Sequence, residues 1–188
     1  MSRWIVLALL LILSSAGILV AAPAELTRMK LHRITVIQGY SCAKDYTFFY
    51  TNGKLERCTT SQEAQYGEAL IPRGSLIYLK PDGSLWGVGL VHSMLIHDVQ
   101  CDGGGFLGPS EGSSTGFFPS GKLRVCYLAK NQVVQGVPCA HQGILASLKG
   151  PDSGVYFHED GRLRSCLLAE DFGNQKKHTI WKPGVSKQ

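Results

Sequence analysis

One pattern of apolar and polar positions occurs four times along the chain and predicts a β-hairpin each time. Each copy has an apolar residue four positions before a glycine and a leucine two positions after it. The copies are residues 48–58, 78–88, 116–126 and 156–166. An Asn, Asp or Ser precedes each glycine, which is typical of a tight reversal because glycine, and to a lesser degree Asn and Asp, tolerate a positive φ. The two apolar columns are therefore expected to face a common core.

A second anchor lies upstream of each hairpin, at residues 37–42, 66–71, 96–101 and 134–139. Units of about 30 residues begin near these anchors. The sequence therefore predicts an all-β, disulfide-stabilised domain of about four stacked β-hairpin repeats over residues 37–169, solenoid-like or arranged as an open β-sheet array. A closed barrel or small propeller is the alternative. Residues 25–36 are expected to form an N-terminal extension and residues 170–188 a C-terminal tail, and a capping-box pattern at residues 60–63 allows at most two helical turns.

Six cysteines follow the N-terminal apolar segment: Cys42, Cys58, Cys101, Cys126, Cys139 and Cys166. Three copies carry a cysteine at both anchor positions, whereas the second copy has Ile71 and Val88 in these columns. Because both partners are absent together, bonds within a unit are favoured among 15 connectivities. The expected pairs are Cys42–Cys58, Cys101–Cys126 and Cys139–Cys166, each contributing about 3 kcal/mol in the chain-entropy model. No cysteine pair has the C-x₂-C spacing typical of zinc sites, so no metal or other cofactor is expected.

The first 24 residues predict export. One cation, Arg3, precedes an uncharged apolar run at residues 4–13, and small residues follow up to an A-x-A-like cleavage site at residues 22–24. Cleavage there lowers the net charge from +5 to +4, because Arg3 is the only charged residue removed. The mature chain is expected in the periplasm or outside the cell, where disulfides persist and nucleic acid is not an expected partner. The alternative is a membrane anchor through residues 4–22.

The hairpin pattern aromatic-x-x-[Asn/Asp/Ser]-Gly-[Lys/Arg]-Leu, as in residues 49–55 and 157–163, resembles the repeating hairpins of MORN-type proteins and related bacterial antitoxin-like repeats. The resemblance covers residues 37–169. The chain departs from it in its longer period, its added cysteines and its lack of the Tyr-x-Gly and Gly-x-Gly elements. The resemblance implies a non-catalytic scaffold or binding surface, in some members directed at lipid, and it transfers no functional residues.

Motifs that could carry catalysis stand in the wrong context. Residues 112–116 match G-x-S-x-G, but a hairpin strand follows where a hydrolase needs a helix. Residues 103–108 match G-x-G-x-x-G, but Pro109 follows where a helix should begin. His97-Asp98 is the best candidate pair, yet Asp98 falls in a turn column, which explains it without catalysis. No catalytic residue is therefore expected.

The leading hypothesis is an exported, non-enzymatic protein with a structural or binding role at the cell envelope or outside the cell. The alternative is an extracytoplasmic hydrolase acting on cell wall or polysaccharide. Its site would lie in the two inserted loops, residues 102–116 and 140–153, with Ser114, His141 and Asp152 as the residues to test.

Cations recur after the turn glycines. They are Lys54, Lys122 and Arg162 directly after the glycine, and Arg124 and Arg164 two positions further on. If the units stack in register, these side chains line one edge and could bind an anionic polymer, a lipid headgroup or a protein. The alternative is that they protect exposed hairpin edges from pairing with other chains. Five aromatic residues could form a carbohydrate or peptide platform, but at strand spacing most of them are expected to be packing residues: Tyr40, Tyr46, Tyr66, Trp86 and Tyr156.

Overall fold

The computed structural model describes residues 26–103, 115–141 and 154–184, and over these ranges the chain forms 18 strands and no helix. The expected all-β class is confirmed. The predicted signal peptide and most of both inserted loops lie outside the described residues. The prediction of up to two helical turns starting at residues 60–63 is wrong. Ser61 N donates to the Ser41 carbonyl at 2.7 Å, and strand β6 (Ala64–Tyr66) follows directly.

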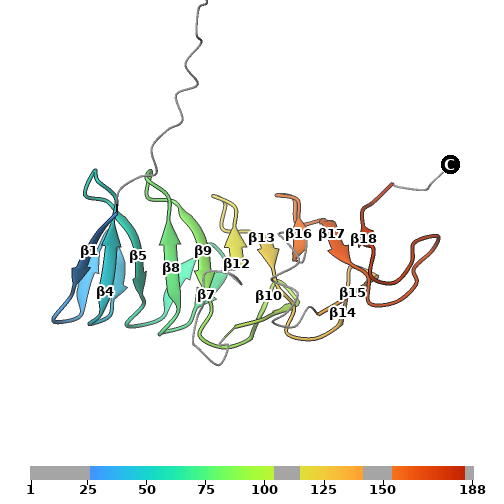
Figure 1. Ribbon diagram of the computed structural model, residues 1–188, viewed down its shortest axis with the longest axis horizontal. Helices are drawn as coiled ribbons and strands as arrows, with labels where there is room; N and C mark the ends of the chain where they lie inside the picture. Colours follow the sequence, from blue (N-terminus) through green and yellow to red (C-terminus); the bar gives the residue numbers. More distant parts are fainter. Residues whose placement is uncertain (1–25, 104–114, 142–153, 185–188) are drawn as a thin grey trace, which may run out of the picture.

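Ten strands form one antiparallel sheet, and their order across the sheet is their order along the chain. They are β1 (Thr27–Lys30), β4 (Tyr46–Phe49), β5 (Leu55–Thr59), β8 (Leu76–Leu79), β9 (Leu85–Gly89), β12 (Thr115–Phe117), β13 (Leu123–Cys126), β16 (Val155–Phe157), β17 (Leu163–Leu167) and β18 (Ile180–Trp181). Figure 1 shows the sheet running along the long axis of the molecule. The sheet is open over the described residues, with β1 and β18 at its edges. These edge strands come from the segments expected to be an extension and a tail.

Four two-stranded hairpins alternate along the chain with pairs of sheet strands. They join β2 (Thr35–Ile37) to β3 (Tyr40–Cys42), β6 to β7 (Ala69–Ile71), β10 (Met94–Ile96) to β11 (Val99–Cys101), and β14 (Gln132–Val134) to β15 (Val137–Cys139). We call them the small hairpins. Their buried residues belong to one core cluster with the inner residues of the sheet, so they form a second layer against one of its faces. That these pairs are four copies of one repeat stays a prediction from the sequence.

The four turns that join paired sheet strands have one geometry. Their glycines, Gly53, Gly83, Gly121 and Gly161, have φ between 76° and 92°. In the second turn Gly83 N donates to the Lys80 carbonyl at 2.8 Å, which makes a type I turn followed by a left-handed glycine. The residue before the glycine does not have a positive φ. In the turns where this residue is Asn or Asp, its side chain accepts a backbone hydrogen bond, as Asp82 does from Ser84 N at 2.8 Å.

This hydrogen bond is the physical reason for Asn or Asp in the turn pattern. Asn52 and Asp160 accept the equivalent backbone N–H at 3.0 Å, from Lys54 and Arg162. The side-chain hydroxyl and backbone N–H of Ser84 together hold the pKa of Asp82 below its usual value. The turn chemistry therefore differs from the expectation that Asn and Asp were selected for a left-handed backbone.

One row of inner side chains joins the two layers. The strand register runs from Cys58 through Ile77 and Val88 to Thr115, and all four are at most 1% exposed. The disulfides Cys42–Cys58, Cys101–Cys126 and Cys139–Cys166 connect small hairpins to this face, with Cα–Cα distances between 5.6 and 5.7 Å. These are the three expected pairs. They indicate folding in an oxidising environment.

In the second copy, made of the small hairpin β6–β7 and the sheet strands β8 and β9, apolar side chains stand at the two positions that are cysteines in the other copies. Ile71 is 1% exposed and Val88 is fully buried, as the equivalent cysteines are elsewhere. The expected core columns also face each other, since Leu79 pairs with Leu85 in the register and the other three copies follow the same rule. Seven positions after the turn glycine, three copies have a leucine and the first has Thr60, which is buried and donates to the Pro72 carbonyl at 3.0 Å.

Replacing Cys101 with Ile and Cys126 with Val, as in the second pair of hairpins, is expected to leave the protein folded but about 3 kcal/mol less stable. The loss comes from the missing cross-link, because the new side chains are apolar at fully buried positions. Replacing both with Ser should cost more, since it buries two hydroxyls without assured partners. Urea unfolding under non-reducing conditions measures both variants, and equal losses would contradict the assignment of these columns to the core.

Candidate functional site

The strands of the two layers differ in charge. The sheet strands carry five cations and one carboxylate, whereas the small-hairpin strands carry no charged residue. The charged residues of the sheet strands are Arg28, Lys30, Glu56, Arg57, Arg124 and Arg164. The inner face of the sheet is occupied by the core. The excess positive charge of the strands therefore belongs to the outer face of the sheet.

Aromatic rings hold two of these cations in place. The register places Arg57 between Phe48 and Tyr78, and its guanidinium carbon lies 4.1 Å from the centroid of the Phe48 ring. At the sheet edge, the guanidinium carbon of Arg28 lies 3.9 Å from the centroid of the Tyr46 ring. Stacking of this kind orients a guanidinium while leaving its edge able to donate hydrogen bonds. The N-terminal half of the outer face is therefore both cationic and aromatic.

A shallow cleft of about 560 Å³ opens on this half of the face, lined by Leu26, Tyr50, Glu56, Arg57, Tyr78, Leu79, Lys80 and Trp86. Trp86 is 47% exposed, and its ring meets the Tyr78 ring edge to face with the centroids 6.2 Å apart. Glu56 Oε2 lies 3.1 Å from Arg57 Nε, yet burial raises the pKa of Glu56 more than this cation lowers it. Burial also raises the pKa of Tyr78 to about 12, so its phenol is neutral at physiological pH.

The cations expected to form one row fall into two groups. Arg124 and Arg164 lie on strands of the sheet, and the Arg124 guanidinium covers Gly116, where an added Cβ would lie 2.7 Å from Nη2. Lys54, Lys122 and Arg162 lie in the turns at the end of the hairpins. Arg28, Lys30 and Arg57 are also on sheet strands and were not among the cations expected from the sequence. The signal that could have identified them is a cation opposite an aromatic residue on the neighbouring strand.

The expected packing role of the aromatic residues holds for some of them. Tyr40 and Tyr66 pack against the core, and the Tyr66 ring meets Phe117 edge to face at 5.7 Å. Tyr46 is 42% exposed beneath Arg28, and Trp86 lines the cleft. Tyr156 is half-buried in the outer row of the register, between Val125 and Ser165.

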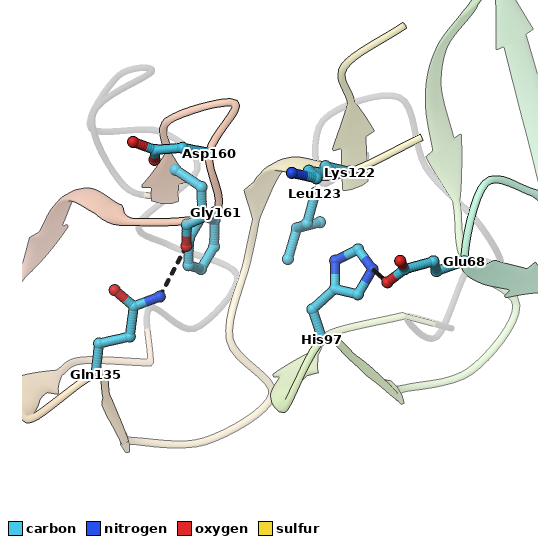
Figure 2. Close-up of a pocket in the computed structure, with 8 residues that line it drawn as sticks. Glu68, His97, Lys122, Leu123, Gln135, Asp160 and Gly161 are labelled. Carbon is cyan, nitrogen blue, oxygen red and sulfur yellow. Dashed lines mark hydrogen bonds and ion pairs between the residues drawn. The ribbon is translucent and has the colours of Figure 1, made fainter. Parts of the chain in front are cut away.

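A second hollow, the turn pocket, lies where turns of the two layers meet. It has a volume of about 200 Å³ and is lined by Glu68, His97, Lys122, Leu123, Gln135, Phe157, Asp160 and Gly161. Figure 2 shows Lys122 and Leu123 on one side, Gln135 and Gly161 on the other, and His97 below. His97 Nε2 lies 3.4 Å from Glu68 Oε2 of the neighbouring small hairpin. Gln135 Nε2 donates to the Gly161 carbonyl at 2.8 Å.

A contact between two glycines brings these turns together. A Cβ added to Gly121 would lie 2.5 Å from the Gly67 Cα, and one added to Gly67 would lie 2.6 Å from the Gly121 Cα. Both residues also have a positive φ. Glu68 and Lys122, the next residues in each turn, therefore reach the same pocket.

Gly121→Ala is expected to cost about 3 kcal/mol, because the left-handed backbone penalises alanine and the added Cβ collides with backbone. Gly53→Ala is the matched control, since Gly53 has the same place in its turn but open space around its Cβ position. It should cost only about 1 kcal/mol. Chemical unfolding measures both, and equal losses would show that the contact between Gly67 and Gly121 contributes nothing.

The turn beside this pocket has an unusual backbone. His97 and Asp98 have φ of 47° and 63°, whereas each of the other three small-hairpin turns contains a glycine with a positive φ. Such a conformation costs about 1 kcal/mol or more for a residue with a Cβ. The expectation that Asp98 occupies a turn position is confirmed. The His97 side chain contacts Glu68 of the neighbouring small hairpin.

Replacing His97 with Asn and Asp98 with Gly creates the Asn-Gly pair that such two-residue turns favour, and it should raise the stability by about 1 kcal/mol. The strand pairing from Met94 to Cys101 should persist, because it is made by the backbone. The melting temperature measures this gain. An unchanged or lower melting temperature would show that the His97-Asp98 turn carries no strain.

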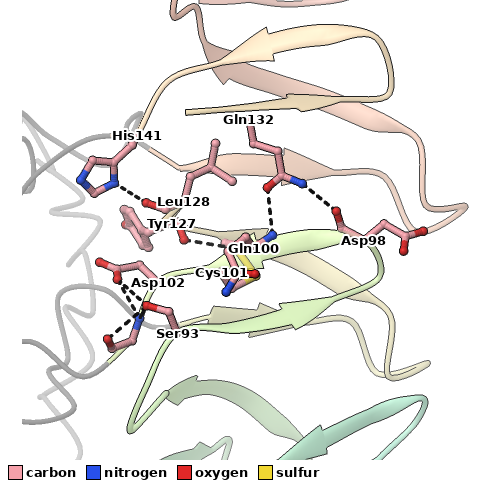
Figure 3. Close-up of a disulfide and its surroundings, with 11 residues drawn as sticks. Ser93, Asp98, Gln100, Cys101, Asp102, Tyr127, Leu128, Gln132 and His141 are labelled. Atoms are coloured by element: carbon pink, nitrogen blue, oxygen red, sulfur yellow. Dashed lines mark hydrogen bonds between the residues drawn. A yellow bond between two sulfur atoms is a disulfide. The ribbon is translucent and has the colours of Figure 1, made fainter. Parts of the chain in front are cut away.

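Side chains also join one small hairpin to the next. Gln132 accepts a hydrogen bond from Gln100 N at 2.9 Å and donates to the Asp98 carbonyl at 2.7 Å, as Figure 3 shows beside the Cys101–Cys126 disulfide. His141, a candidate for the alternative hydrolase, bonds through Nδ1 to the Leu128 carbonyl. The small hairpin of β10 and β11, whose turn lines the turn pocket, is therefore also held by the next small hairpin, β14 and β15.

The remaining catalytic candidates cannot be placed. Ser114 and Asp152 lie outside the described residues, as do most of the G-x-S-x-G and G-x-G-x-x-G motifs. Among the residues that the structure places, no three His, Cys, Asp or Glu side chains gather closely enough to hold a metal ion. The described chain also has no helix of the length and apolarity that a membrane crossing requires.

The comparisons with known proteins give no relative. No protein-family model matches the chain, and no curated protein and no solved structure matches it significantly. The resemblance to MORN-type repeats therefore stays a prediction from the hairpin pattern.

Proposed function

We propose that this is an exported, non-enzymatic β-repeat protein that binds an anionic polymer at the cell envelope or outside the cell. The outer face of the ten-stranded sheet is the binding surface. The observation that carries the proposal is the separation of charge, with five cations on the sheet strands and none on the small-hairpin strands. Strand charges that only kept the protein soluble would not need to be confined to the strands of one layer.

The spacing of these cations favours a polymer. Arg28, Arg57, Arg124 and Arg164 lie on β1, β5, β13 and β17, and the exposed Trp86 lies on β9 between them. These are alternate strands of the sheet, so consecutive positions are about 10 Å apart. A linear chain lying along the sheet would meet a charged or aromatic side chain at each step. A small ligand would reach only one of them.

The chemistry of these side chains favours carboxylate or sulfate groups. Arginine binds such planar or tetrahedral anions through paired N–H groups, and its guanidinium is less strongly hydrated than an ammonium. Stacking on Phe48 and Tyr46 orders Arg57 and Arg28 before any partner arrives, which lowers the entropic cost of binding. The three disulfides support a location in the periplasm or outside the cell.

The test is a quadruple variant with Gln in place of Arg28, Lys30, Arg124 and Arg164. We expect it to bind heparin or polyglutamate about tenfold or more weakly than the unchanged protein, because exposed charge pairs each contribute about 0.2–1 kcal/mol. The readout is the salt concentration that elutes the protein from an immobilised polyanion, since such contacts weaken as ionic strength rises.

The matched control replaces Arg33, Lys44, Arg73 and Lys130 with Gln. These four cations are exposed, and replacing them removes the same charge, but they lie in the connections beside the small hairpins. The control should keep most of its affinity. Equal losses of polyanion affinity in both variants would show that binding depends only on the net charge of the protein and not on the outer face. Binding to vesicles of anionic lipid without binding to polyanions would contradict the choice of a polymer.

A further inference from the structure

We propose that the turn pocket binds a carboxylate that is attached to a small apolar group. This site is separate from the polymer surface, because it lies between hairpin turns and most of its lining residues are outside the sheet strands. A peptide C-terminus with an apolar last residue and a free short-chain acid both have this chemistry.

The walls of the pocket are fixed before a ligand arrives. The contact between Gly67 and Gly121 holds two of the turns together. On the opposite wall, Gln135 donates to the Gly161 carbonyl and accepts a hydrogen bond from Leu163 N, both at 2.8 Å. A pocket formed in advance loses little conformational entropy on binding, which suits a small ligand with few contacts.

The charges at the mouth leave one cation unpaired. Asp160 accepts hydrogen bonds from Arg162 N at 3.0 Å and from Arg162 Nε at 2.7 Å. Glu68 is in contact with His97. Lys122, which lines the same pocket and is exposed, has no ion-pair partner among the residues that the structure describes. Its ammonium is therefore the group available to an anionic ligand.

The interior of the pocket selects an apolar neighbour for that anion. Leu123 and Phe157 line it, and they are only 3% and 5% exposed, so each offers one small apolar patch. A volume of about 200 Å³ is below the range of pockets that hold drug-sized molecules and suits a group as large as one amino-acid residue. A branched aliphatic group beside a carboxylate fits both features.

The strained turn is an independent observation at the same place. Of the four small-hairpin turns, only the one at residues 97–98 has no glycine, and its His97 side chain forms part of the pocket. Strained residues that surrounding structure holds in place are concentrated at binding and catalytic sites. Gln38 and Gln135 share the positive φ of His97 in two of the other turns, so the additional strain falls on Asp98, where those turns have Gly39 and Gly136. This strained turn holds His97 in the wall of the pocket.

The first test compares N-acetyl-leucine with N-acetyl-leucinamide by NMR titration of the disulfide-bonded protein. The acid should give saturable shifts of the Leu123 methyl and Phe157 ring resonances, and the neutral amide should bind about tenfold more weakly. Isovalerate, a free acid, and a tripeptide ending in leucine distinguish the two sources of the carboxylate. Tighter binding of one identifies the source. No saturable shift with any of the acids at millimolar concentration, or equal binding of acid and amide, would overturn the proposal.

The second test uses two matched lysines. Lys122→Gln should weaken N-acetyl-leucine about tenfold, whereas Lys54→Gln, at the same turn position outside the pocket, should leave it unchanged. The double variant that combines His97→Asn with Asp98→Gly should bind more weakly although it is more stable. Polyanion binding should change little in all three variants. Equal affinities for the two lysine variants would show that the Lys122 ammonium does not hold the carboxylate.

Discussion

The structure depends on the burial of one row of side chains between the sheet and the small hairpins. Strands of three residues in an isolated hairpin are not stable in water, and a single sheet would leave its apolar face exposed. Packing the two layers together solves both problems, and Cys58, Ile77, Val88 and Thr115 are the residues at which they meet. The three disulfides link the two layers at these buried positions and not at the surface. Each layer is therefore ordered by the other.

This arrangement leaves the outer face of the sheet without a role in the core. Its side chains can then be chosen for charge and for aromatic surface, which explains why a wide sheet in a small protein tolerates five cations on its strands. The charge of the face follows from this choice. Five cations stand on the sheet strands against one carboxylate, Glu56, whose pKa is raised by burial. Arginine remains charged at physiological pH, so the face is cationic there.

Self-similarity along the chain predicted the features that are set by local chemistry. The turn glycines, the apolar columns and the cysteine pairing all follow from comparing four segments, because each residue meets its partner within one pair of hairpins. Contacts between different pairs could not be predicted in this way. The stacking of Arg28 on Tyr46 requires knowing that residues 27–30 form an edge strand, and the contact of Gly67 with Gly121 joins residues that no periodic pattern relates.

The departures from the pattern are as informative as the pattern. In two small hairpins the second turn residue is a glycine, Gly39 or Gly136. In a third, the glycine is the first turn residue, Gly67, and it contacts Gly121. In the turn of His97 and Asp98 it is absent. Both exceptions adjoin the same pocket, but only the turn of His97 and Asp98 is unfavourable for an isolated hairpin, because glycine at the first turn position is also a favoured arrangement and Glu68 has no positive φ. The cross-linked core can offset the strain at residues 97–98, because each disulfide contributes about as much free energy as the strain of two or three left-handed residues. The stability of the stack is thus what allows this one turn to form without glycine.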